Sequence, residues 1–301
     1  MFAMSWPNVA SQTIPLFRRK ASARGRKKKR VSDNERVSEN ELNELLEFAV
    51  ALARGAGDIS LKYFRKQPET SRKADGSFVT IADREAEAYL RRQIAERFPD
   101  DGVLGEEEGE HEGRSGRRWI VDPIDGTFAF VHGVALYGVL IALEIDGEPT
   151  IGVVNMPALN EIVWAASGAG CFFNGEPAHV SSTKSLSDAL LLCTNFHECA
   201  RRGFGDVAEL LQQRARSCRT WGDCYGYVLV ATGRADVMLD PVMNLWDCAP
   251  LLPILEEAGG TFTDWNGVGT IDGGNAIATN GLLFDEVMAL VKEKHAGNSG
   301  D

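Results

Sequence analysis

The chain has 301 residues and a formal net charge of −11; 44% of its residues are hydrophobic and 25% are charged. This composition is typical of a globular protein with a sizeable core, and no apolar run approaches the roughly 20 residues that a membrane span needs. An acidic body repels nucleic acid and membrane phosphate unless metal ions mask its charge. We therefore expect neither nucleic acid nor a membrane as a partner, and we expect part of the acidity to gather at a cation site.

The charge is distributed unevenly along the chain. Residues 1–32 contain nine Lys or Arg and no acidic residue, which is typical of a disordered extension, an organelle-targeting segment or an overlong start. We expect 1–36 to be such a segment, 37–295 to form the functional domain with two lobes that meet near 180–190, and 296–301 to be a disordered tail. The six cysteines lack C-x-x-C spacing, which indicates reduced thiols and a cytoplasmic location.

Two helices are predicted in the first third of the chain. Ser38 stands three residues before Glu41, which is the spacing of a capping box, and an apolar stripe with helical spacing follows. Gly55 and Gly57 are expected to end this helix. A second helix is expected from about Asp83 to Phe98.

Short apolar stretches separated by glycine-containing turns predict strands in the remainder of the chain. The expected strands are 118–122, 137–145, 150–155, 161–166, 186–195, 235–239 and 260–263. Further helices are expected over 207–215, 247–258 and 283–294. Because helices and strands are interspersed and several strands form hairpins, the predicted fold class is α+β or layered α/β.

The stretch Val-Asp-Pro-Ile-Asp-Gly-Thr over residues 121–127 combines two carboxylates with a constrained turn. Asp122 and Asp125 follow a predicted buried strand, and Gly126 lets the backbone approach a ligand closely. Carboxylate oxygens are suited to Mg²⁺, and Thr127 adds a hydroxyl at a place where a new helix would aim N–H groups at a phosphate. A polar turn in which an Asp caps a helix is the structural alternative.

Two further acids extend this pattern. Glu106 follows an apolar–glycine pair and is expected to point inward, whereas Glu108 and Glu110 are expected to be solvated. Asp247 begins a predicted apolar helix, where it would bind a metal or only cap the helix. Because neither His nor Cys belongs to this set, zinc is a poor candidate and Mg²⁺ a good one.

Together these stretches resemble the inositol monophosphatase family of Mg²⁺-dependent, lithium-sensitive phosphatases over roughly residues 40–292. The matching stretches are 73–83, Gly-Glu-Glu at 105–107, Trp-Ile-Val-Asp-Pro-Ile-Asp-Gly-Thr at 119–127, and Trp-Asp-Cys-Ala at 246–249 through Glu-Ala-Gly-Gly at 257–260. The resemblance implies a layered α-β-α-β-α sandwich of the sugar-phosphatase type and a homodimer. It also implies that a metal-activated water hydrolyses a small phosphate monoester.

The resemblance assigns a role to each matching residue. The implied ligands of two or three Mg²⁺ ions, which Mn²⁺ could replace, are Glu106, Asp122, the backbone carbonyl of Ile124, Asp125 and Asp247. Thr127 would help to orient the attacking water, and Glu106 would act in catalysis as well as bind a metal. Asp83, also a catalytic candidate, would lie in the outer shell or near a weak third metal. The backbone of Gly126 and Thr127 would hold the phosphate.

The stretch RTWGDCYGY, which begins at Arg219, resembles the corresponding segment of the family's histidinol-phosphate phosphatases. Asp223 could pair with an ammonium group on the substrate, and inositol phosphate has no such group. Asp240, seven residues before Asp247, could share the ammonium, while Asn244 could hydrogen-bond an imidazole and Arg219 could brace the pocket by pairing with an acid. An ordinary internal ion pair between Arg219 and Asp223 is the structural alternative.

The leading hypothesis is a histidinol-phosphate phosphatase of histidine biosynthesis, which converts L-histidinol phosphate and water to L-histidinol and phosphate. An inositol-1-phosphate phosphatase, or another small sugar or nucleotide phosphatase of the same family, is the alternative within the class. A non-catalytic metal- or phosphate-binding regulator is an alternative of another class, but its sequence would lack a ligand or Thr127. A nucleic-acid-associated protein that uses the basic tail is a third.

Overall fold

A computed structural model of the protein describes residues 37–74 and 76–297. The basic segment 1–36, with its predicted disorder or targeting role, lies outside the described residues. So does the predicted tail, except for its first two residues, which belong to the last helix. None of the helices in the described ranges is both long and apolar enough to cross a membrane.

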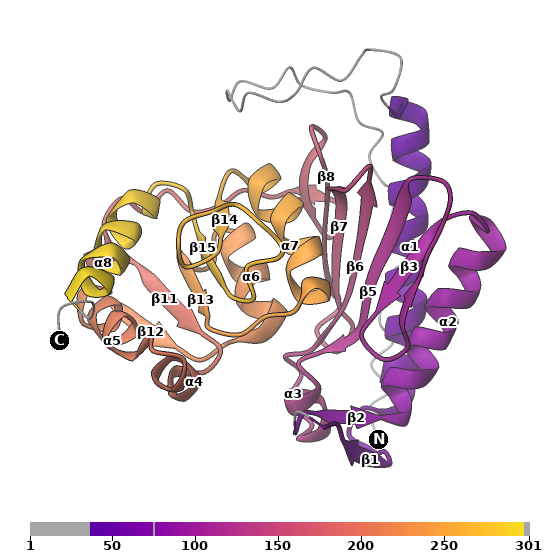
Figure 1. The fold of residues 1–301 in the computed structure, drawn as a ribbon, viewed down its shortest axis with the longest axis horizontal. Helices are drawn as coiled ribbons and strands as arrows, with labels where there is room; N and C mark the ends of the chain where they lie inside the picture. Colours follow the sequence, from indigo (N-terminus) through magenta and orange to yellow (C-terminus); the bar gives the residue numbers. More distant parts are fainter. Residues whose placement is uncertain (1–36, 75, 298–301) are drawn as a thin grey trace, which may run out of the picture.

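Five layers, alternately helical and β, make up the described chain (Figure 1). The first layer is α1 (Glu39–Tyr63) and α2 (Ile81–Arg97), which cover one face of an eight-stranded sheet. The third layer is α6 (Asp223–Ala231) and α7 (Leu245–Ala258), which lie between that sheet and a five-stranded one. The outer helices are α4 (Phe196–Arg201), α5 (Gly205–Arg214) and α8 (Phe284–Gly297). This arrangement confirms the predicted α-β-α-β-α sandwich.

The large sheet has the strand order β10-β9-β8-β7-β6-β5-β3-β4. Its strands are β3 (Gly102–Gly105), β4 (Gly109–His111), β5 (Arg117–Asp125), β6 (Gly138–Ile145), β7 (Glu148–Met156), β8 (Glu161–Ala166), β9 (Gly170–Phe173) and β10 (Glu176–Pro177). All neighbours are antiparallel except β3 and β5, which are parallel. Helices cover both faces of β6 and β7, so these strands are apolar on both sides instead of alternating.

The small sheet has the order β12-β11-β13-β15-β14, and β11 is parallel to both of its neighbours. Its strands are β11 (Leu190–Cys193), β12 (Ser217–Arg219), β13 (Val237–Asp240), β14 (Thr261–Thr263) and β15 (Ala276–Thr279). A hairpin of β1 (Thr70–Arg72) and β2 (Phe78–Thr80) precedes α2, and the short α3 (Thr127–Val131) follows β5. The one-turn 3₁₀ helix η2 (Leu186–Asp188) precedes β11.

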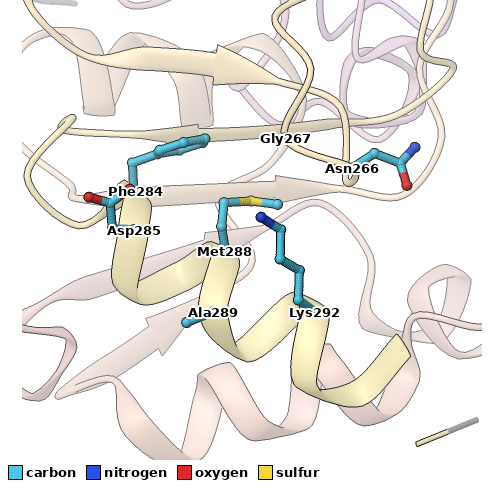
Figure 2. A pocket seen from close by; sticks show the side chains of 7 residues that line it. All are labelled: Asn266, Gly267, Phe284, Asp285, Met288, Ala289 and Lys292. Atoms are coloured by element: carbon cyan, nitrogen blue, oxygen red, sulfur yellow. The ribbon is translucent and has the colours of Figure 1, made fainter. Parts of the chain in front are cut away.

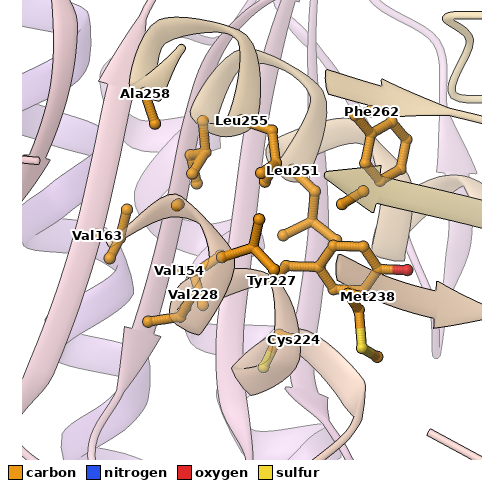
Figure 3. Close-up of a cluster of buried hydrophobic side chains, with 14 of the residues drawn as sticks. Val154, Val163, Cys224, Tyr227, Val228, Met238, Leu251, Leu255, Ala258 and Phe262 are labelled. Carbon is orange, nitrogen blue, oxygen red and sulfur yellow. The ribbon is translucent and has the colours of Figure 1, made fainter. Parts of the chain in front are cut away.

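One apolar cluster joins the two sheets through α6 and α7 (Figure 3). Val154 and Val163 enter it from the large sheet, Met238 and Phe262 from the small one, and Tyr227 from α6 between them. Because protein interiors pack at close to crystal density, such a shared core fixes the two sheets relative to each other. It therefore also fixes the ends of the helices that lie between them.

The first helix differs from its prediction at its C-terminal end. Ser38 caps it as expected and accepts a hydrogen bond from the Glu41 N–H at 3.2 Å, but the helix runs past Gly55 and Gly57 to Tyr63. A Cβ at Gly55 would lie 2.1 Å from the hydroxyl oxygen of Tyr89. The glycine allows α1 and α2 to pack closely instead of ending the helix.

Three other elements also depart from their predictions. Helix α2 begins at Ile81, two residues early, because Thr80 caps it. The predicted strand 186–195 is a 3₁₀ turn followed by the four residues of β11. Helix α6 was not predicted, because it is apolar almost all round and shows no amphipathic period.

Gly152 of β7 offers a test of the contact between the large sheet and α7. A Cβ added there would lie 2.0 Å from the backbone carbonyl oxygen of Pro250 in α7, and a backbone atom cannot rotate away. We expect Gly152→Ala to lower the free energy of unfolding by about 1–3 kcal/mol, measured by urea denaturation. The control Thr150→Ala on the same strand should stay within about 0.5 kcal/mol of wild type. Wild-type stability of Gly152→Ala would show that α7 does not rest on β7 as described.

Candidate active site

The N-termini of four helices meet on one side of the molecule. Asp83 is the third residue of α2 and Thr127 is the first of α3, and the Thr127 hydroxyl lies 3.4 Å from a carboxylate oxygen of Asp83. Asp223 begins α6 and Asp247 is the third residue of α7. Helix N-termini carry partial positive charge and favour anions. The fold therefore gathers acids at the helix ends that tolerate them best.

Three carboxylates form the centre of this region. Asp122, Asp125 and Asp247 each offer one oxygen, and these oxygens all lie within 4.8 Å of one another. Burial and the neighbouring acids raise the pKa of Asp125 and of Asp247 to about 7 and that of Asp122 well above its usual value. Within the described ranges, no ion pair neutralises any of the three.

Backbone N–H groups hold one oxygen of each of these acids. Ile124 donates to Asp122 at 2.9 Å, where the pairing of β5 with β6 shifts register, and Cys224 donates to Asp125 at 2.6 Å. Asp247 accepts from the Asn244 N–H at 2.7 Å, so it helps to cap α7 from the third helical position, while Asn244 and not Asp247 is the N-cap. A carboxylate has about four lone-pair sites, so each acid keeps capacity for a cation. Capping and metal binding are therefore compatible.

Glu106 borders the cluster from the loop after β3. It is close enough to Asp122 to raise the pKa of that acid, and its Oε1 accepts from Lys73 Nζ at 2.7 Å. Lys73 also reaches Glu107 at 2.6 Å. The buried Glu87 shapes this loop, because its carboxylate accepts the N–H groups of Glu107 and Glu108 at 2.7 and 3.0 Å. As predicted, Glu106 is mostly enclosed and Glu108 is exposed.

Glu110 is likewise exposed, as the sequence predicted. The Thr127 hydroxyl donates to the carbonyl oxygen of Ile124 at 2.9 Å. Asp83 is fully buried and accepts from the N–H and hydroxyl of Thr80 at 2.8 and 2.6 Å, while burial raises its pKa to about 6. Gly126, with a φ of +78°, lets the chain turn from β5 into α3. The turn thus carries Thr127 to Asp83.

A second acidic pair lies beside the cluster. The Asp223 carboxylate oxygen Oδ2 would lie 3.1 Å from a Cβ at Gly126, and Asp125 together with burial raises the pKa of Asp223 to about 7. Asp240, at the end of β13, is buried, and its pKa is raised well above the usual value, in part by Asp223. Asn244 is exposed at the N-cap of α7.

Arg219 forms no ion pair with Asp223, which was the structural alternative, and none with any other acid among the described residues, so the pairing expected to brace the pocket is absent there as well. Its Nη1 donates instead to the carbonyl oxygen of Cys218 at 2.7 Å, and no ion pair between described residues reaches Asp223 or Asp240. The reason is geometric: Asp223 adopts a φ of +50° and lies against the turn at Gly126, whereas Arg219 is exposed on the edge strand β12.

Several residues at the site were missed from the sequence. Lys73 lay in a stretch that resembles the family, but nothing in its spacing showed that it reaches Glu106. The sequence predicts only a strand at Thr194, although its hydroxyl accepts from the Asp223 N–H and donates to the Asp240 carboxylate. Thr80, three residues before Asp83, matches a capping box and was the one signal that the sequence did offer.

A separate surface hollow lies against α8 (Figure 2) and carries none of these acids. Its lining residues are Asn266, Gly267, Phe284, Asp285, Met288, Ala289 and Lys292. It combines one acid and one base with apolar side chains and lacks any convergence of like charges. The chemistry of the molecule is therefore expected at the acidic cluster.

The donor set of the cluster fits a divalent cation. All the available ligand atoms are hard carboxylate oxygens, and Mg²⁺ and similar ions are bound by a few such groups. Burial and the neighbouring acids raise the pKa values of these acids, and no ion pair within 37–74 and 76–297 supplies them with a positive partner. A bound cation would supply that charge.

Comparison with known proteins agrees with this geometry. The profile of the inositol monophosphatase family matches residues 41–296. A histidinol-phosphatase of Chlorobaculum parvum is 44% identical and covers 82% of this chain and 96% of its own length. A histidinol-phosphatase of Mycobacterium tuberculosis is 41% identical, covering 81% and 96%. The structure of an IMPase from Thermotoga maritima aligns with a TM-score of 0.76 at 34% identity, covering 83% of this chain and 97% of the other.

The family match covers the acidic cluster, both sheets and the helices between them. The relatives at 41–44% identity are both histidinol-phosphatases, and the match extends over 96% of the length of each. The family is metal-dependent, and the chain provides an acidic cluster that could hold a metal. The chain therefore belongs to the inositol monophosphatase family and is a phosphoric monoester hydrolase.

Proposed function

We propose that the chain hydrolyses L-histidinol phosphate to L-histidinol and phosphate, in histidine biosynthesis and with Mg²⁺ as its metal. The observation that carries the substrate assignment is the acidic pair Asp223 and Asp240. Both lie beside the metal-type cluster, and neither has a cationic partner in the described chain. A substrate ammonium group would supply one positive charge between them.

Physical chemistry favours an aminated leaving group at this position. A buried carboxylate without a cation or several donors is costly, and the pKa of Asp223 is already raised to about 7. Inositol phosphate offers hydroxyl groups but no positive charge, so it would leave both acids uncompensated. The two relatives named as histidinol-phosphatases act on an ester that does carry an amine, which supports the same choice.

The residues divide into three roles under this proposal. The metal ligands would be Glu106, Asp122, the carbonyl of Ile124, Asp125 and Asp247. Bound Mg²⁺ ions would stabilise negative charge on the phosphate ester and lower the pKa of water. The Thr127 hydroxyl, between the Ile124 carbonyl and Asp83, would orient the attacking water, and the N–H groups of Gly126 and Thr127 would hold the phosphate.

Asp223 and Asp240 would bind the substrate ammonium. Asn244, exposed at the N-cap of α7, would form a hydrogen bond with the imidazole. Arg219 would act only by supporting the loop that precedes α6. A homodimer, a cytoplasmic location, the number of Mg²⁺ ions, replacement by Mn²⁺ and a lobe boundary near 180–190 stay predictions.

Asp122→Asn tests the metal site. The amide keeps the size of the side chain but removes a charge, so we expect turnover to fall by at least about a hundredfold with the fold intact. Steady-state kinetics with saturating Mg²⁺ and circular dichroism would measure both. Asp188→Asn, at an exposed acid of η2, is the matched control and should keep wild-type turnover. Near-normal turnover of folded Asp122→Asn would remove this residue from the ligand set.

The metal should also change how stability depends on pH. Folding raises the pKa values of Asp125 and Asp247 from 3.8 to about 7, so the folded state holds these protons more firmly than the unfolded state. Their protonation therefore stabilises the fold fully below about pH 4, and this contribution is lost as pH rises through about 7. In EDTA we expect Tm to fall between pH 5 and pH 8.

Saturating Mg²⁺ should raise Tm more at pH 8 than at pH 5, because only the ionised carboxylates bind the ion. Differential scanning calorimetry at the two pH values would measure the two shifts. Asp247→Asn should reduce the difference between them. An equal or larger Mg²⁺ shift at pH 5 would contradict a carboxylate site with these pKa values.

Asp223→Ala tests the substrate assignment. Loss of the carboxylate should raise KM for L-histidinol phosphate by about tenfold or more, since a charge-assisted contact is removed. KM for glycerol phosphate, which has no amine, should change much less. A uniform effect on both esters would indicate a structural role for Asp223, and faster cleavage of inositol 1-phosphate than of L-histidinol phosphate by the wild type would refute the substrate assignment.

A further inference from the structure

Thr194 links the two acids of the proposed ammonium site through one hydroxyl group. It directly follows β11, and its Oγ1 lies 2.9 Å from the backbone nitrogen of Asp223 and 2.7 Å from Oδ2 of Asp240. The backbone N–H can only donate, so Oγ1 accepts from it. The single hydroxyl proton is then free to point to Asp240. The directions of both hydrogen bonds are thereby fixed.

Close packing holds this arrangement in place. A Cβ at Gly222 would lie 2.4 Å from the Cα of Thr194, so only glycine lets the start of α6 approach β11 this closely. Asp223 itself has a φ of +50°, which an Asp adopts only at some energetic cost. Its neighbour Cys224 donates its N–H to Asp125 of the acidic cluster. The first turn of α6 is thus held between Thr194 on one side and a proposed metal ligand on the other.

The contact leaves the remaining oxygens of both acids available to a ligand. In the part of the chain that the structure describes, no hydrogen bond reaches the side-chain oxygens of Asp223 or Oδ1 of Asp240. Trp265 fixes the backbone of Asp240 by donating its indole N–H to the carbonyl oxygen at 3.0 Å. The backbone of each acid is therefore tethered, while the Asp223 carboxylate and Oδ1 of Asp240 accept no hydrogen bond from the described residues.

We propose that Thr194 is the positioning residue that gives the site its selectivity for an ammonium-bearing phosphate ester, because its hydroxyl fixes the position of Asp223 relative to Asp240. This inference rests on the proposed function and assigns it a residue that contacts neither the metals nor the phosphate. Thr194 sets where the positive end of the leaving group lies relative to the cluster. It affects selectivity and leaves the hydrolytic centre unchanged.

A purely structural role makes a different prediction. If Thr194 only caps α6, its loss would lower stability and reduce activity toward all phosphate esters alike. If it positions the two acids, its loss would affect esters with an amine and spare those without one. The variants are Thr194→Val, which keeps the shape but removes the hydroxyl, and Thr194→Ser, which keeps the hydroxyl.

Thr232→Val is the matched control, because the Thr232 hydroxyl bonds the carbonyl of Val228 at 2.7 Å at the other end of α6. A further variant, Thr194→Ala, also removes the hydroxyl but introduces no new atoms into the contact with Gly222. It keeps the inference testable if Thr194→Val does not fold.

The experiment measures kcat and KM for L-histidinol phosphate and glycerol phosphate, and the Mg²⁺ concentration that gives half-maximal activity. For Thr194→Val we expect a rise of about tenfold to a hundredfold in KM for L-histidinol phosphate. KM for glycerol phosphate and the Mg²⁺ requirement should change by less than about threefold, a shift below 1 kcal/mol. Thr194→Ser should recover most of the loss, Thr194→Ala should reproduce it, and Thr232→Val should match wild type.

Two results separate failure of this inference from failure of the proposed function. If the wild type prefers L-histidinol phosphate and Thr194→Val keeps that preference, the positioning role is overturned and the substrate assignment stands. If the wild type shows no preference for the aminated ester, the substrate assignment fails. Amide hydrogen exchange then decides what is left: faster exchange of the Asp223 N–H in Thr194→Val supports the positioning of Asp223, and unchanged exchange overturns it.

Discussion

Carboxylates that lie close together in a largely enclosed site repel one another, and the proposed chemistry depends on this repulsion. Asp122, Asp125 and Asp247 offer oxygens within 4.8 Å of one another, and their pKa values are all raised. Such a cluster is costly in water-poor surroundings unless protons or a cation neutralise it. The same cost would favour cation binding, because a bound cation would relieve a repulsion that the fold imposes.

Several acids in and around this cluster lie in the first turns of helices, where the partial positive charge of the helix stabilises them. Asp83 and Asp247 each occupy the third position of a helix and accept N–H groups from the residue that caps it, at Thr80 and Asn244. Asp223 starts a third helix. The N-terminal end of a helix stabilises an anion by a few tenths to about 1 kcal/mol. The middle layer, α6 and α7, supplies Asp223 and Asp247, and α2 supplies Asp83 from the other face of the large sheet.

Under the proposed function, selectivity and catalysis would use different parts of this arrangement. The proposed metal ligands at the end of β5 and the start of α7 accept backbone N–H groups of Ile124, Cys224 and Asn244. The proposed ammonium site comes from the small sheet and α6, through Asp223 and Asp240. Cys224 couples the two, since its N–H bonds Asp125 while the preceding residue belongs to the ammonium site. A change of leaving group could thus leave the metal cluster untouched.

The sequence by itself determined the fold class, the family, most long elements and three acids that the structure brings together, because apolar periodicity and the motif over 122–127 are encoded locally. It did not determine that α1 continues through Gly55, that the apolar α6 exists, or that Arg219 is not paired with Asp223. It also gave no sign of Thr194 and little of Lys73. Those features depend on contacts between segments far apart in the chain, where the close approach of two backbones or the direction of one hydroxyl decides the outcome, and only the tertiary structure fixes such contacts.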